Sequence, residues 1–512
     1  MAICRGTIFK KREVIMIKSI FTFSEATYYW DLCDCRIKGA EYSVFLDGEK
    51  VLTTDKTDFT IENLEADKTY NLEVYAQNNS EKLILVAEKF RTKRMPDFVN
   101  VRDFGAVGDG KTVETKALQS AIDAVCEGQT LYFPAGTYLT GAIKLHSNMD
   151  VYLDDGATIQ GTANPEDYLP RIKSRFEGLT VDSYSPLIGL GDIDFDGGIN
   201  AENVMLYGKG TILGGGRELC DAVIESEAVR LADYMKSLGA ELETFENHKT
   251  IPGRARPRLI YACNTKNITL NGLTMGNGSC WNVHFVFCED VLTYNCKIVS
   301  HGVWNGDGWD PDSSVNCTIF NCEFDTSDDC IAIKSGKNPE GDVVNRPTRN
   351  VKVFDCRFVC GHALAVGSEM SGGVDGVYVW DCDAGTLLNG LSIKTTKKRG
   401  GYVKNIYVNN STFTRLGVIA VIYNDDGKGA KHPPFIGDFY LEDVVFTGER
   451  VKEDGTAHEV EPIMLTGVDE GEYRIHNINL KNVTIDTNGR CKDHSIVLRS
   501  VSGLNISNLS VR

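Results

Sequence analysis

The sequence predicts an all-β protein in which a small β-sandwich over residues 17–94 precedes a right-handed parallel β-helix over residues 95–512. In the first part, apolar and polar residues alternate in short runs at the spacing of a sandwich. In the second part, strand-like segments recur about every 25 residues. At 512 residues the chain is too long for one ordinary compact domain, whereas stacked repeats escape that limit because each packs only on its neighbours. We treat residues 1–16 as an N-terminal tail.

The first part carries the segments "EYSVFLDG", "DFTIENL" and "TYNLEVYAQN", separated by turn residues. The passage "FTIENLEADKTYNLEVYA" resembles the fibronectin type III pattern, with Leu64 and Tyr70 placed for its tyrosine corner. Such a domain could bind carbohydrate or shape a substrate site, or it could serve as a spacer or docking module, because fold alone does not define function. The stretch "RTKRMPDF", residues 91–98, is interpreted as the linker.

The β-helix is predicted from segments such as "NITLNGLTM", "CTIFNCEF", "VKVFDCRF" and "VYVWDCDA", which share one alternating pattern. Their equivalent positions are Gly272, Cys296, Cys322, Cys356, Cys382, Ser411, Val444 and Val483. Short strands that recur in this way build a parallel β-helix, in which each coil stacks on the last. The cysteines of these segments are therefore expected to be small, buried, apolar residues of the interior.

Composition narrows the possible locations and partners. Sixteen cysteines without metal-ligand pairs indicate free thiols in a reducing compartment. The N-terminal apolar runs "VIMI" and "SIFTF" are short and separated by Lys18, so they predict neither a signal peptide nor a membrane segment. We expect a cytoplasmic protein, with non-standard secretion as the alternative. The net charge of -17 argues against nucleic acid and an anionic membrane surface as partners, and the sequence leaves the oligomeric state open.

Six aspartates crowd into residues 305–336, "NGDGWDPDSSVNCTIFNCEFDTSDDCIAIKSG". They are Asp307, Asp310, Asp312, Asp325, Asp328 and Asp329. A solvated acidic loop, a cation site and paired carboxylates for acid–base chemistry are the three interpretations. Because Ile331 and Ile333 must point inward, strict alternation would bury Asp329 as well. An unpaired buried carboxylate is costly, so the chain is expected to bend after Asp329 and present both acids on the outer surface.

Register between coils predicts which residues meet there. Aligning Leu364 with Ile331 places His362 over Asp329, and aligning "NGDGWDPD" places Asp307 beneath it, at the strand separation of about 4.8 Å. Three carboxylates this close cannot all be ionised comfortably, so at least one should hold its proton above the usual pKa. A calcium site is the alternative, which the histidine fits less well. We therefore predict no metal and no cofactor.

The motifs together resemble glycoside hydrolase family 28, the polygalacturonases. "NGDGWD", "SDDCIAIKSG" and "CGHALAVGS" are similar to three family motifs in order, and "VRDFGAVGDGKTVETKALQSAID" resembles the start of these β-helices. The likeness covers about residues 97–512. It implies inverting hydrolysis of α-1,4-linked galacturonic acid in pectin, with Asp328 protonating the leaving oxygen. Asp307 and Asp329 would activate water, and His362 would orient this group.

One motif departs from the family pattern. Where the family has Arg-Ile-Lys, this chain has "LSIKTTKKRGG", which keeps Lys394 but replaces the arginine with Ser392. Serine cannot hold a carboxylate bidentately as arginine does. We expect the following basic residues to supply the patch that an anionic substrate needs, with a solvated turn as the alternative. They are Lys397, Lys398 and Arg399.

Two aromatic positions complete the predicted substrate site. Tyr423 in "VIYNDDG" matches a downstream tyrosine of the family, and Trp309, like Trp304, could form a sugar platform or pack in the core. The insertion "KNPEGDVVNRPTRN" and the sandwich resemble exo-acting members, so the predicted activity is that of an exo-polygalacturonase on acidic oligosaccharides. A pectate lyase, which would use calcium for β-elimination, and a non-catalytic polysaccharide-binding β-helix are the competing interpretations.

Overall fold

A computed structural model describes residues 17–32, 40–78, 82–196, 198–420, 423, 428–452, 454–487 and 496–512. The chain divides into two compact units, Met1–Asp97 and Phe98–Arg512, so the division falls three residues after the expected boundary. The proposed tail, residues 1–16, lies outside the described part. Among the described helices, none combines the length and the apolar character that crossing a membrane requires.

The first unit consists of two antiparallel sheets. One sheet has the order β1-β2-β5 and the other β4-β3-β6-β7. The bounds are β1 (Lys18–Phe21), β2 (Ala26–Tyr29), β3 (Glu41–Leu46), β4 (Glu49–Thr54), β5 (Asp58–Ile61), β6 (Thr69–Gln77) and β7 (Lys82–Arg91). Both sheets contribute to one apolar core, in which Tyr28 and Phe59 stack. The Tyr70 hydroxyl accepts a hydrogen bond of 2.9 Å from the Glu65 amide, and Leu64 is buried, which is the arrangement of a tyrosine corner.

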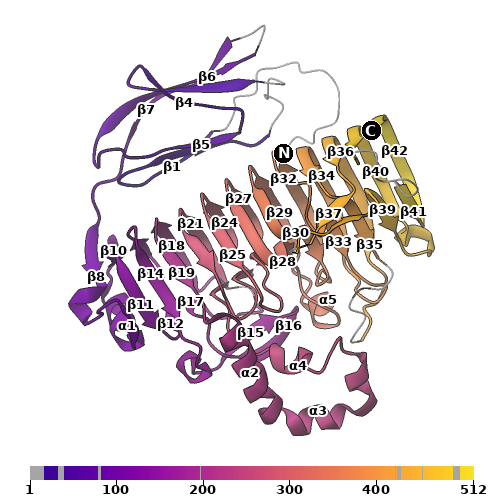
Figure 1. Cartoon of the computed structure of the whole chain (residues 1–512), viewed down its shortest axis with the longest axis horizontal. Coiled ribbons are helices and arrows are strands. Elements are labelled where there is room, and N and C mark those ends of the chain that lie inside the picture. Colours follow the sequence, from indigo (N-terminus) through magenta and orange to yellow (C-terminus); the bar gives the residue numbers. More distant parts are fainter. Residues whose placement is uncertain are drawn as a thin grey trace. The chain divides into compact units, whose positions relative to one another are not determined.

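The second unit is a parallel β-helix whose successive coils follow one another along the molecule (Figure 1). Its strands form three parallel ladders. The first ladder contains β8 (Asp97–Asn100), β10 (Gln129–Phe133), β13 (Met149–Leu153), β18 (Ala201–Gly208), β21 (Thr265–Asn271), β24 (Glu289–Tyr294), β27 (Val315–Phe320), β29 (Thr348–Phe354), β31 (Val374–Trp380), β34 (Tyr402–Phe413), β36 (Phe435–Phe446), β40 (Ile475–Ile485) and β42 (Val501–Val511).

The second ladder contains β9 (Asp109–Val113), β11 (Gly136–Thr140), β14 (Ala157–Gly161), β19 (Thr211–Leu213), β22 (Thr274–Gly276), β25 (Lys297–Ser300), β28 (Glu323–Ile333), β30 (Arg357–Gly367) and β32 (Asp383–Ala384), followed by the later halves of β34, β36, β40 and β42. The third ladder contains β12 (Ile143–Lys144), β17 (Ile188–Leu190), β20 (Ile260–Cys263), β23 (Val283–Val286), β26 (Trp309–Asp312), the later halves of β28 and β30, β33 (Asn389–Lys394), β35 (Leu416–Ile419), β39 (Ile463–Thr466) and β41 (Ile496–Arg499). This third ladder carries the candidate active site.

Turns between the first and second ladders repeat because asparagine and aspartate tolerate the left-handed conformation. Asn295, Asn321, Asp355 and Asp381 have φ values of 55°, 47°, 47° and 57°. Their side chains also bond from coil to coil: the Asn321 amide donates to Asn295 at 2.8 Å. Just before these turns the rings of Tyr294, Phe320, Phe354 and Trp380 stack on one another.

The repeat equivalences predicted from Cys296 to Val483 agree with the observed registers. The first equivalence is wrong by one residue. Thr274 pairs with Lys297, so Leu273, and not Gly272, corresponds to Cys296. Gly272 instead occupies the preceding turn position at a φ of 76°, where glycine is favoured. The cysteines in this stack are buried free thiols, as predicted.

Helices and hairpins interrupt the coils. The bounds are α1 (Thr115–Ala124), α2 (Gly216–Arg230), α3 (Ala232–Leu238), α4 (Thr250–Gly253) and α5 (Glu340–Val344), with hairpins β15 (Ile172–Phe176)–β16 (Leu179–Ser183) and β37 (Glu449–Val451)–β38 (Ala457–Glu459). The helical insertion from α2 to α4 was not anticipated by the repeat pattern. It lies beside β15 and β16 (Figure 1).

Candidate active site

The predicted column of acidic residues forms on the outer face of the third ladder. The pairing of β28 with β30 shifts between Asp325 and Asp329 but is continuous from Asp329 to Ile331, so the irregularity precedes Asp329 and does not follow it as expected. Asp329 then pairs with His362, as the alignment predicts. On the preceding coil, Trp309 pairs with Ile331, which places Asp307 one coil before Asp329. The Gly308 amide donates to the Asp329 carbonyl at 2.9 Å and holds this register.

Asp329 is an ionised carboxylate held by two basic groups. Lys394 Nζ donates to both of its oxygens, at 2.8 and 2.6 Å, and His362 Nδ1 lies 3.1 Å from Oδ1. Burial alone would raise the pKa of Asp329, but Lys394 and His362 outweigh burial and lower that pKa below its ordinary value. Asp329 therefore keeps its negative charge throughout the physiological pH range.

Asp328 has the opposite character. Its side chain is 29% exposed, and its Oδ1 accepts a hydrogen bond of 2.9 Å from the Asp329 amide. Burial, and then the negative charge of Asp329, raise the pKa of Asp328 above the ordinary aspartate value. Neighbouring carboxylates with pKa values pushed apart are the usual source of one acid and one base in the same site.

Asp307 is buried against Lys334, whose Nζ donates to Asp307 Oδ2 at 3.2 Å. The same ammonium lies 3.7 Å from Glu369 and 4.2 Å from the centre of the Trp281 ring. Burial raises the pKa of Asp307 well above its ordinary value, although Lys334 opposes this shift. Asp307 is thus a carboxyl group that binds its proton more readily than an exposed aspartate does.

Lys334 and Glu369 belong to the site but have no predicted role. The alternation of "IAIKSG" already places Lys334 on the outer face, two residues beyond Ala332, so that signal was present in the sequence. Glu369 lies in "VGSEM", outside any repeat, and only the fold brings it to Lys334. Burial alone would raise the pKa of Glu369, but Lys334 and its basic neighbours lower it to about 2.

The other aspartates of the crowded stretch have different surroundings. Asp310 is fully buried, and its burial raises its pKa to about 8. Asp312 pairs with Arg175 Nη1 at 3.3 Å, and both side chains are fully buried. Asp325 lies 3.1 Å from His301 Nε2 at the surface. Asp328 and Asp329 therefore lie beside His362, and Asp329 also binds Lys394. Asp307 and Asp310 both lie close enough to Asp328, Asp329 and Lys334 for these charges to affect their pKa values.

The predicted basic cluster is divided by the fold. Lys397 and Lys398 are exposed, and Lys397 Nζ lies 3.5 Å from Glu470. Arg399 is fully buried, and its Nη1 donates to Asn338 Oδ1 at 2.6 Å. Arg399 therefore supports a loop and has no surface to offer a substrate. Tyr423, in contrast, is close to the site, because Lys394 Nζ lies 5.4 Å from its ring centre.

The prediction that Trp309 forms a sugar platform is wrong. The side chain is fully buried in the interior of the β-helix, and its Nε1 donates to Thr293 Oγ1 at 3.0 Å. Its register partner is the inward-facing Ile331, so the pleat directs Trp309 into the core. Trp304 is half-buried, with the Arg256 guanidinium 4.6 Å from its ring centre.

Ligand atoms of Asp328, Asp329 and His362 lie within 4.8 Å of one another, a spacing that could hold a metal ion. However, the Lys394 ammonium already contacts both Asp329 oxygens. A cation at this position would have to displace or repel that ammonium. The donor set therefore favours acid–base chemistry over metal binding.

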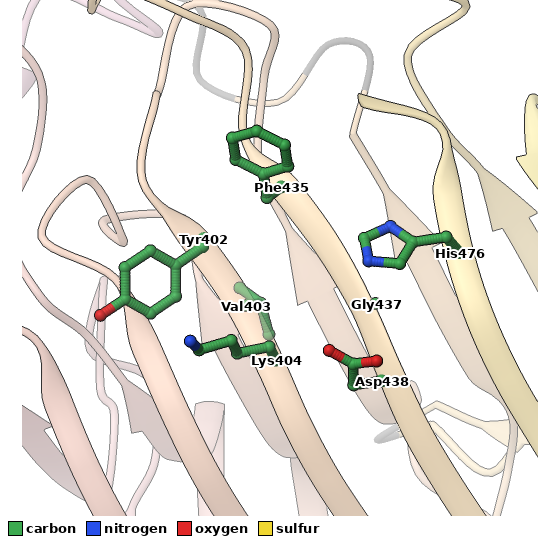
Figure 2. Close-up of a pocket in the computed structure, with 7 residues that line it drawn as sticks. All are labelled: Tyr402, Val403, Lys404, Phe435, Gly437, Asp438 and His476. Carbon is green, nitrogen blue, oxygen red and sulfur yellow. The ribbon is translucent and has the colours of Figure 1, made fainter. Parts of the chain in front are cut away.

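A pocket of about 250 Å³ lies elsewhere, over the first ladder (Figure 2). Its walls come from β34, β36 and β40 and include Tyr402, Phe435 and His476. None of the residues in the carboxylate group contributes to this pocket. The carboxylates instead lie on a different ladder, where Asp328 and His362 are partly exposed and Asp307 and Asp329 are buried.

Comparison with known proteins points to one family. The model described as glycosyl hydrolases family 28 matches residues 195–504, and one described as rhamnogalacturonase A/epimerase, pectate lyase-like, matches residues 98–167. A probable polygalacturonase of Vitis vinifera is 32% identical over 328 residues, which cover 61% of this chain and 60% of that protein. The exo-poly-alpha-D-galacturonosidase of Dickeya chrysanthemi is 28% identical over 378 residues, covering 69% and 62%. The chain thus spans about three fifths of the length of these relatives.

Solved structures agree with this result. The family 28 exopolygalacturonase of Yersinia enterocolitica matches with a TM-score of 0.76 and 20% identity, covering 97% of this chain and 95% of that one. At that identity the match shows the fold alone. The hyperthermoactive exopolygalacturonase from Thermotoga maritima matches with a TM-score of 0.64 and 26% identity, covering 81% and 93%.

Proposed function

Because this chain belongs to glycosyl hydrolase family 28, we propose that it hydrolyses the α-1,4 linkages of pectin-derived oligo- or polygalacturonate, with inversion. One observation carries the proposal: Asp307, Asp328 and Asp329 come together on the third ladder, where the pKa is raised for Asp307 and Asp328 and lowered for Asp329. The names of the relatives, which include polygalacturonases and an exo-poly-alpha-D-galacturonosidase, support the same substrate.

In the proposed mechanism Asp328 gives its proton to the glycosidic oxygen as the bond from that oxygen to the anomeric carbon breaks. A water molecule held by Asp329 and Asp307 adds to the anomeric carbon from the opposite side and passes its proton to this pair. Asp307 is the stronger proton acceptor of the two once it is ionised, because its pKa is the higher one. His362 and Lys394 keep Asp329 charged and in position.

We further propose exo-action, because loops form a wall along the edge where the strands of the third ladder end. The insertion at residues 337–350 includes α5, and its Glu340 accepts a hydrogen bond of 3.1 Å from the Thr180 amide of the β15–β16 hairpin. On its other side, Asn338 Nδ2 donates to the Lys428 carbonyl at 2.6 Å. A wall anchored on both sides can block one end of a groove and admit only chain ends.

The first unit is proposed to be a fibronectin type III-type module. The sheet orders and the Tyr70 hydrogen bond support this assignment. Two roles are possible for this unit, carbohydrate binding and spacing. KM and kcat of the isolated second unit, compared with those of the whole chain on the same substrate, distinguish them. The cytoplasmic location stays a prediction.

The products of trigalacturonate distinguish the candidate chemistries. We expect new reducing ends without ultraviolet absorbance, at a rate that EDTA leaves unchanged, because Lys394 occupies the oxygens that a cation would need. Calcium-dependent formation of unsaturated, absorbing ends would identify a lyase instead. Binding without either product would leave a polysaccharide-binding β-helix.

A time course on long polygalacturonate tests exo-action. If the wall closes one end of the groove, short products of a single size should accumulate while the remaining polymer stays long. Size-exclusion chromatography of early samples measures this. Fragments of random length at low conversion would contradict exo-action without affecting the proposed chemistry.

A further inference from the structure

An acidic substrate needs a cation, yet the basic residues around the carboxylates are already engaged. Lys394 binds Asp329, and Lys334 lies between Asp307 and Glu369. Arg399 is fully buried. The register of the third ladder indicates where a free cation could act.

A row of small outward-facing residues forms the floor beside the catalytic column. Ala332 pairs with Ala365, Ala365 with Ser392, and Ser392 with Gly417. In the parallel row, Asp329 pairs with His362, and His362 with Asn389. Ala332 and Ala365 are fully buried and Ser392 is 6% exposed, so among these three only Ser392 presents surface to a sugar.

The guanidinium of Arg415 lies over this floor. Its Nε and Cζ are 3.5 and 3.9 Å from the position that a Cβ on Gly417 would occupy. Its Nη2 donates to Asn389 Oδ1 at 2.6 Å. Arg415 thus bridges the two rows, one coil beyond Ser392 and two coils beyond His362.

Among the described residues, Arg415 makes no ion pair with a carboxylate. Its side chain is half-buried, and within the described residues Nε is buried without a hydrogen-bond acceptor and the guanidinium makes no ion pair. Glu461 and Arg450 are the charged groups that act on it. Burial lowers the pKa of Arg415 and outweighs the opposing effect of the Glu461 carboxylate.

We propose that Arg415 binds the carboxylate of a substrate sugar that lies over Ser392, beside the guanidinium that covers Gly417. This inference rests on the proposed function, since it assumes an acidic sugar. The guanidinium is already partly dehydrated and oriented by Asn389, so a carboxylate would meet a preorganised cation at a small cost in ordering. Arg415 would thereby serve, from the next coil, the role that the Ser392 side chain is too short to fill.

The test compares Arg415→Gln with Arg357→Gln on trigalacturonate. Arg357 is an equally charged control on β30 whose exposed side chain pairs with Glu323 at 2.8 Å. Arg415→Gln should raise KM roughly tenfold or more, as for loss of a charge-assisted hydrogen bond, with a smaller change in kcat. Arg357→Gln should behave as wild type. Thermal unfolding of both variants checks that the fold is intact.

A methyl-esterified substrate tests whether Arg415 recognises the carboxylate itself. In an Asp328→Asn background, which prevents cleavage, calorimetry should show that methyl-esterified trigalacturonate binds more weakly than the acid. Adding Arg415→Gln should remove most of that difference. An unchanged KM in Arg415→Gln, an equal rise in Arg357→Gln, or an undiminished ester effect would overturn the role of Arg415. Failure of wild-type protein to cleave or bind trigalacturonate would instead refute the proposed function.

Discussion

Asp328→Asn is expected to lower kcat by at least about 10²-fold, because it removes the proton donor to the leaving oxygen. The fold should survive, since asparagine keeps the shape of the side chain and the acceptor for the Asp329 amide. Asp325→Asn is the matched control: it lies on the same strand but pairs with His301 at the surface. Steady-state kinetics on trigalacturonate, with circular dichroism of both variants, make the comparison.

The pH dependence of the rate tests the role of Asp328 as the acid independently. Activity needs Asp328 protonated, so the rate should fall as pH rises through its pKa, which burial and Asp329 raise. As pH falls, Asp307 should gain its proton first, because burial raises its pKa, and Asp329 last, because Lys394 and His362 lower its pKa. The rate should therefore also fall on the acidic side, at apparent pKa values that belong to the coupled group. In Asp328→Asn the alkaline limb should disappear. Near-normal turnover of this variant would eliminate Asp328 as the acid.

Asp329→Asn is expected to abolish nearly all turnover and also to destabilise the protein. Lys394 and Asp329 are only 10% and 4% exposed, so the substitution leaves a buried ammonium without its partner. Breaking a buried pair in this way typically costs about 3–5 kcal/mol. Denaturant unfolding of the two proteins measures the loss of stability.

Asp329→Asn combined with Lys394→Met separates the two effects. Removing both charges should restore much of the stability, because no buried charge is left unpaired, while the activity stays lost. Adding Asp307→Asn to this variant should lower turnover by a far smaller factor than Asp307→Asn does in the wild type, because the three aspartates act as one unit. Recovery of activity in the double variant would show that Asp329 serves only to neutralise Lys394.

The fold was largely predictable because its repeat is a local property of the chain. The inward positions around Cys322, Cys356 and Cys382 repeat one alternation, and their register follows from matching apolar residues. That same matching placed Asp329 beside His362. The helical insertion at α2–α4 was not predicted because its sequence lies outside the repeat and does not follow the pattern of the neighbouring coils.

The sequence by itself determined the parallel β-helix and the column of Asp307, Asp329 and His362, because coil stacking converts spacing along the chain into distance in space. It did not determine how each charge is satisfied. Lys394 on Asp329, Lys334 between Asp307 and Glu369, and the burial of Arg399 and Trp309 were decided by the tertiary structure. The physical reason is that pKa values and free cations depend on desolvation and on partners from other coils, which no single segment contains.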